Sequence, residues 1–214
     1  MASKKGQYFS FDAIVAAVIF VLAISILSNH WFSLRAQMDE QTLFLQDEAI
    51  RLSEIFVSPG DYDVNDNNPN VKTIWYERPE LARKAGFGQN GSFEGNLVLG
   101  YGNQPSIIAA SEFLREDRNY DSSRLLLSTP VHYYVTFNLS ITNPEDFKVG
   151  NLQSLPSINQ AIGKAPYPES EVVKIVRPVA AFQKIILSIY PPQTKIAYYT
   201  GNMTIYVWMN SSRS

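Results

Sequence analysis

Two patterns of hydrophobic and polar positions divide the chain near residue 58. No charged side chain occurs between Asp12 and Arg35, and residues 13–28 are almost entirely aliphatic. The uncharged run holds 22 residues. As a helix rising about 1.5 Å per residue it would be roughly 33 Å long, enough to cross a hydrocarbon core of about 30 Å. We therefore predict a membrane-spanning helix over residues 13–34.

The helix is expected to continue well beyond this run. Neither glycine nor proline occurs between Gln7 and Ser58. After the apolar run, apolar residues recur at helical spacing among charged ones, which is typical of an amphipathic helix. They are Leu34, Met38, Leu45, Ala49, Leu52 and Phe56. We predict one helix over residues 7–58, with this stripe buried against a following domain and Ser58-Pro59-Gly60 ending it.

Residues 59–214 are expected to form a β-rich head. All twelve prolines lie at or beyond Pro59, and hydrophobic residues alternate with polar ones over residues 131–141, the period of a strand. Further strands are predicted at residues 171–182, 184–190, 195–199 and 202–209, with a hairpin turn at residues 199–202. Short helices are predicted at residues 79–85, with Gly86 after the end, and at residues 106–115. The fold class is α+β, a long N-terminal helix followed by a β-rich globular head.

Composition and charge exclude several functions. The chain has 214 residues, 18 Lys and Arg against 20 Asp and Glu, a net charge of −2 and no cysteine. The balance gives no indication of a nucleic-acid partner, and the lack of cysteine excludes disulfides, thiolate metal sites and cysteine nucleophiles. The two histidines, His30 and His132, have no partner at ligand spacing. We expect no enzyme activity, no metal and no cofactor.

The residues flanking the apolar run predict the topology. Lys4 and Lys5 precede it, so the positive-inside rule places the N-terminus in the cytoplasm and the head outside the cell. The run continues into residues 29–32, Asn-His-Trp-Phe, which are typical of an interfacial anchor rather than a cleavage site. We expect a single-pass protein of the cell membrane.

The extreme N-terminus indicates processing. Lys4-Lys5-Gly6-Gln7, followed by residues 8–12 and the apolar run, resembles the class III signal peptide of archaeal type IV pilin-like proteins. The resemblance implies a leader at residues 1–6 that prepilin peptidase removes by cutting between Gly6 and Gln7. It also implies a type IV pilin-like fold and a structural role, as a major or minor subunit assembled with other pilin-like subunits in a surface filament. The alternative for Lys4 and Lys5 is an uncleaved signal anchor.

The resemblance assigns a role to Asp12 as well. In the family, an early carboxylate pairs with the N-terminal ammonium of a neighbouring subunit, and Asp12 is the only candidate here. It would be the sixth mature residue, whereas the family pattern has an acid at the fifth, and one residue rotates a helix by about 100°. The alternative is a carboxylate stabilised by the helix macrodipole alone.

Four Asn-x-Ser/Thr tripeptides make the head a candidate glycoprotein. They begin at Asn90, Asn138, Asn202 and Asn210. Asn138 falls on the polar face of the predicted strand at residues 131–141, so a glycan there would point to solvent. The competing function for the whole chain is a membrane-anchored ectodomain that binds a ligand or a surface without polymerising.

Overall fold

The computed structural model describes residues 4–60, 62–64, 72–77, 82, 84–88, 96–100, 106–114, 117–144, 157–168, 170–189 and 192–209. The described elements are α1 (Lys4–Val57), β1 (Tyr62–Val64), β2 (Lys72–Ile74), β3 (Leu97–Gly100), α2 (Ile107–Phe113), α3 (Asp117–Leu126), β4 (His132–Ile141), β5 (Ile158–Gly163), β6 (Val173–Ile189) and β7 (Pro192–Trp208). The chain divides into two compact units, Met1–Phe44 and Leu45–Ser214. The layout is α+β, as the sequence predicts.

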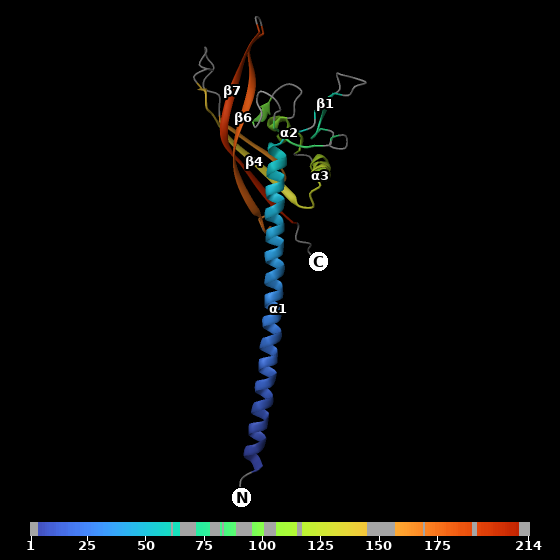
Figure 1. Cartoon of the computed structure of the whole chain (residues 1–214), viewed down its shortest axis with the longest axis vertical. Helices are drawn as coiled ribbons and strands as arrows, with labels where there is room; N and C mark the ends of the chain where they lie inside the picture. Colours follow the sequence, from blue (N-terminus) through green and yellow to red (C-terminus); the bar gives the residue numbers. More distant parts are fainter. Residues whose placement is uncertain are drawn as a thin grey trace. The chain divides into compact units, whose positions relative to one another are not determined.

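A five-stranded sheet in the order β3-β6-β7-β4-β5 forms the centre of the second unit. Neighbouring strands are antiparallel except for β3 and β6, which pair in parallel. The hairpin of β6 and β7 is the longest pairing, from Val173 opposite Val207 to Ile189 opposite Pro192, and is drawn in orange to red in Figure 1. Strands β1 and β2 form a separate two-stranded sheet.

Two of the predicted strand boundaries are wrong. The strands predicted at residues 171–182 and 184–190 are one strand, β6 (Val173–Ile189), and the predicted turn at residues 199–202 lies inside the continuous strand β7. Gly201 suggested a turn, but it sits opposite Leu139 where β4 and β7 run close together. A Cβ on Gly201 would collide with the backbone oxygen of Asn138. This glycine therefore serves close strand pairing rather than a change of direction.

The short helices are partly as predicted. The helix at residues 106–115 is confirmed as α2, and its N-cap Ser106 accepts a hydrogen bond at Oγ from the Ala109 N–H at 3.3 Å. The helix at residues 79–85 is wrong where the structure describes it, because residues 82, 84 and 85 are not helical. Gly86 does not cap a helix. It has a φ of 151° and lies so close to Ser58 that a side chain would collide with that residue's backbone oxygen.

The buried stripe of α1 is confirmed in its second half and wrong in its first. Leu45, Ala49, Leu52 and Phe56 are at most 3% exposed and belong to the core formed with the sheet. Leu34 and Met38 are 43% and 59% exposed. The helix therefore contributes only its last turns to the core of the head.

An aromatic cluster holds the end of α1. The Phe56 ring lies 6.4 Å from Trp75, 6.0 Å from Phe87 and 5.7 Å from Tyr133, measured between ring centroids. The backbone N–H of Phe87 donates to the Phe56 oxygen at 3.0 Å, and Trp75 Nε1 donates to the oxygen of Gly86 at 2.9 Å. Rings at such separations add to the free energy of simple burial. The cluster thus joins α1 to the segment preceding β3 and to β4.

We predict that Phe56→Ala lowers the free energy of unfolding of the head by about 3–5 kcal/mol, because it removes a fully buried ring and leaves a cavity. Urea unfolding of the full chain in detergent, followed by tryptophan fluorescence, measures this change. Leu125→Ala is the control, since Leu125 is 81% exposed and its loss is expected to change stability by less than about 0.5 kcal/mol. Equal unfolding midpoints for the two variants would contradict the prediction.

Candidate functional site: the exposed N-terminal helix and the head surface

The first unit presents an exposed apolar helix surface. The most apolar stretch of 18 residues has a mean hydropathy of 2.5, and none of it is buried within the chain. Ile19, Ile26 and Leu27 are 61%, 69% and 68% exposed. The core helix of a soluble protein is equally apolar but mostly buried, whereas none of this stretch is buried among the residues that the structure describes. The helix is long and apolar enough to cross a membrane.

The residues expected to take part in processing and assembly lie at the start of α1. Lys4, Lys5, Gly6 and Gln7 form its first described turn. The proposed cut therefore falls inside a helical segment close to its beginning. Asp12 is exposed and has no ion-pair partner among the described residues.

Two of the four candidate glycosylation sites lie in the described part of the head. Asn138 on β4 and Asn202 on β7 are directly opposite each other, and both are exposed. Ser140, which completes the first tripeptide, is exposed, whereas Thr204, which completes the second, is only 6% exposed. Asn138 thus lies on a solvent-facing strand surface, as predicted. Asn90 and Asn210 lie outside the described residues.

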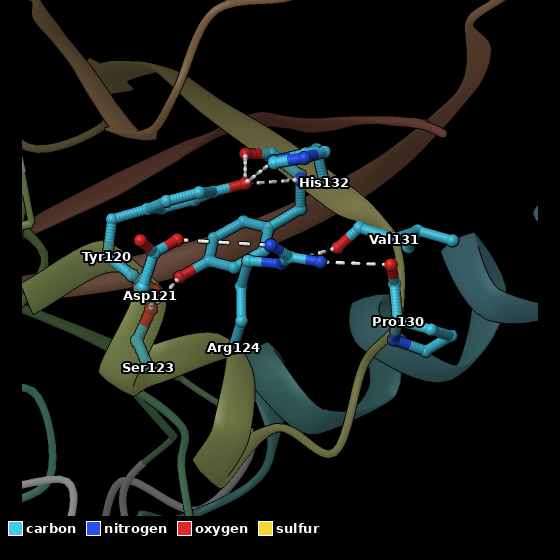
Figure 2. Close-up of polar contacts among 8 residues, drawn as sticks. Tyr120, Asp121, Ser123, Arg124, Pro130, Val131 and His132 are labelled. Atoms are coloured by element: carbon cyan, nitrogen blue, oxygen red, sulfur yellow. Dashed lines mark hydrogen bonds and ion pairs between the residues drawn. The ribbon is translucent and has the colours of Figure 1, made fainter. Parts of the chain in front are cut away.

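A polar cluster between α3 and β4 was not predicted from the sequence. Figure 2 shows Arg124 of α3 reaching the chain before β4, where its Nε donates to the Val131 oxygen at 3.0 Å and its Nη2 to the Pro130 oxygen at 2.9 Å. Its Nη1 lies 3.9 Å from the carboxylate of Asp121. One sequence signal for α3 is the cation Arg124 in its last turn, a favourable position but a common one.

Tyrosine hydroxyls complete this cluster. The Tyr120 hydroxyl accepts a hydrogen bond from the Tyr133 N–H at 2.9 Å and lies 3.2 Å from His132 Nδ1. The hydroxyls of Tyr133 and Ser123 share a hydrogen bond of 2.6 Å. Burial raises the pKa of Tyr120 to about 12 and also raises the pKa of Tyr133, so both phenols are neutral at pH 7. Fully buried hydroxyls that already have partners fix α3 to β4 and offer no nucleophile.

The His132 ring is stacked between two aromatic rings. It lies 6.0 Å from Tyr120 and 5.7 Å from Trp208, with interplanar angles of 11° and 20°. Burial lowers the pKa of His132, and the charges of Arg124 and Lys164 lower it further. The imidazole is therefore neutral at pH 7 and is held by stacking and by the Tyr120 hydroxyl. Within the part of the chain that the structure describes, no group of three or more His, Cys, Asp or Glu residues could hold a metal ion.

Comparison of the chain with protein-family models, with curated proteins and with solved structures finds no match. The functional assignment therefore depends on the chain's own residues.

We predict that the head loses stability as the pH falls below about 6.5, the ordinary pKa of histidine. The folded state holds the pKa of His132 below that value, so between the two pKa values the unfolded chain binds more protons. The contribution of His132 to the stability of the head is fully present above pH 6.5, and it is lost as the pH drops toward the lowered pKa. Thermal unfolding of the full chain at pH 7.5 and 5.5 measures the effect, with His132→Gln as the comparison. A drop of the same size in both proteins would contradict the role of His132.

Proposed function

We propose that this chain is a pilin-like structural subunit of a surface filament. Prepilin peptidase cuts it between Gly6 and Gln7, α1 anchors it in the membrane, and α1 later packs against the same helix in other copies. The observation that supports this most is the division of α1 into two chemically different parts. The helix is exposed and mostly apolar at residues 13–27, yet its last turns are part of the core of the head.

This division is what an assembling subunit requires. A surface this apolar needs a lipid or protein environment, and helices that leave the bilayer can retain one by packing against each other. The head stays folded during the transfer because its core includes only residues from Leu45 onward. The N-terminal motif Lys4-Lys5-Gly6-Gln7 supplies the processing signal. A non-polymerising anchored ectodomain would need the apolar helix but not this motif.

The first test is the mature N-terminus. We predict that protein recovered from its native membrane begins at Gln7, as measured by intact mass and N-terminal sequencing. Gly6→Leu is expected to leave the leader attached, because cutting is expected to need a small residue at this position. Ser3→Ala, a change elsewhere in the leader, is the matched control and should be processed normally. A wild-type chain that begins at Met1 or Ala2 would refute the pilin-like assignment.

The second test concerns Asp12. We propose that its carboxylate pairs with the α-ammonium of Gln7 in a neighbouring copy, which offsets the unfavourable placement of a charge at the apolar boundary. Asp12→Asn is then expected to reduce the yield of sheared filaments at least about tenfold, with the amount of processed subunit in the membrane unchanged. Asp39→Asn, which neutralises another exposed acid of α1, should leave the yield unchanged. Equal yields from both variants would favour a role for Asp12 in the helix macrodipole alone.

A further inference from the structure

Arg35 is the single lysine or arginine in a long part of the chain. Between Gln7 and Ile50 the sequence has no other lysine or arginine, whereas it has five acids. Those acids are Asp12, Asp39, Glu40, Asp47 and Glu48. Arg35 is exposed and makes no ion pair within the described residues, although Asp39 lies only one helical turn away.

The place of Arg35 along α1 matches the edge of a bilayer. It is the first charge after the uncharged run of 22 residues, which is about as long as a hydrocarbon core is thick. The headgroup layer adds roughly 5–8 Å on each side of that core. Asp39 is about 6 Å further along the helix axis. When the run spans a bilayer, Arg35 therefore enters the headgroup layer, and Asp39 and Glu40 lie at its outer edge.

Two exposed aromatic residues precede Arg35. Trp31 and Phe32 are 66% and 67% exposed. Tryptophan is enriched at the headgroup level of membranes, because its ring is apolar and its N–H is polar. Trp31 and Arg35 are four residues apart, so they share one side of the helix. The order along α1 is aliphatic run, aromatic pair, cation and then acids, which follows the layers of a bilayer from hydrocarbon to water.

We propose that Arg35 binds the phosphate of a membrane lipid in the leaflet next to Trp31, and that this contact sets the depth of α1. A guanidinium suits this ligand, since two parallel N–H groups can donate to two phosphate oxygens. A free phosphate ion would approach from water past Asp39 and Glu40, whereas a lipid phosphate lies on the bilayer side of both acids. The inference depends on the part of the proposed function that places α1 in a membrane.

Magnetic resonance between carbon and phosphorus tests the contact directly. The full chain, labelled with carbon-13 at the arginine Cζ atoms, is reconstituted in phosphatidylcholine vesicles, and the dephasing of the Cζ signal by lipid phosphorus is measured. We expect Arg35→Gln to reduce this dephasing at least threefold. Arg177→Gln, which removes a guanidinium of the head, is the matched control and should leave it unchanged. Equal dephasing in wild type and Arg35→Gln would overturn the proposal.

A second pair of samples separates lipid phosphate from free phosphate. Vesicles of digalactosyl diacylglycerol form bilayers without phosphorus, so the dephasing is expected to fall at least threefold in them. Excess inorganic phosphate in the same vesicles should not restore it. Dephasing by inorganic phosphate equal to that in phosphatidylcholine would show a site for the free anion and would overturn the proposal.

Tryptophan quenching measures the depth. Trp75 and Trp208 are buried in the head, so quenching by brominated lipids reports on Trp31, and Trp31→Phe should abolish it. We expect bromines near the headgroup end of the acyl chains to quench at least twice as strongly as bromines at the chain ends. Equal quenching by the two lipids would contradict a position of Trp31 beside the headgroups.

Charge reversal tests whether Arg35 sets this depth. Arg35→Glu is expected to lose at least half of the quenching, because phosphate repels the new carboxylate and the segment moves toward water. Gln41→Glu is the matched control, since this exposed residue lies about 9 Å further along the axis and its change should have no effect. Equal quenching in wild type and Arg35→Glu would overturn the role in depth.

Flotation of the vesicles on a density gradient separates this inference from the proposed function. A chain that floats with the vesicles but shows no dephasing by lipid phosphorus refutes the phosphate contact and leaves the proposed function standing. A chain that does not float refutes the membrane anchor, and with it both proposals.

Discussion

The architecture depends on how the last turns of α1 are held in the head. Phe56 is fully buried among Trp75, Phe87 and Tyr133, and the chain beyond the helix returns at Gly86 to pass directly against Ser58. The Phe87 N–H then donates to the Phe56 oxygen, and the Val98 N–H at β3 donates to the Phe87 oxygen at 2.9 Å. The end of the helix, the returning loop and the first strand of the sheet are thus connected residue by residue. A substitution in any of these three segments is expected to disturb the packing of the other two, because the interior is close-packed.

This constraint gives α1 two roles. Residues from Leu45 onward are part of a folded domain, while residues 13–27 are exposed and mostly apolar. Under the proposed function, the same helix passes from lipid to contact with other copies while the head keeps its core. The polar cluster around Arg124 and Tyr120 fixes α3 to β4.

The sequence predicted those features that depend on local periodicity. The alternation over residues 131–141 and the spacing of Leu45, Ala49, Leu52 and Phe56 each identify a buried face, and both are present. The errors arose at glycines, because glycine occurs both at turns and helix ends and where two backbone segments approach closely. Gly201 and Gly86 suggested a turn and a helix end, but both permit close backbone approach between segments distant in sequence. Helix α3 was not predicted. Its buried side is defined by the contacts of Tyr120 and Ser123 with β4, and these tertiary contacts leave no pattern in the local sequence. Of the candidate site, the exposed apolar helix was foreseeable, whereas the polar cluster between α3 and β4 required the tertiary structure.

The most direct test of this account is the folding of two soluble fragments. A fragment of residues 45–214 retains the last turns of α1, and a fragment of residues 58–214 lacks them. The account predicts that the first unfolds cooperatively in urea with its tryptophans buried, and that the second shows no cooperative transition, because it lacks Phe56 and the rest of the buried stripe. Cooperative unfolding of both fragments at the same urea concentration would contradict the claim that the end of α1 is part of the head.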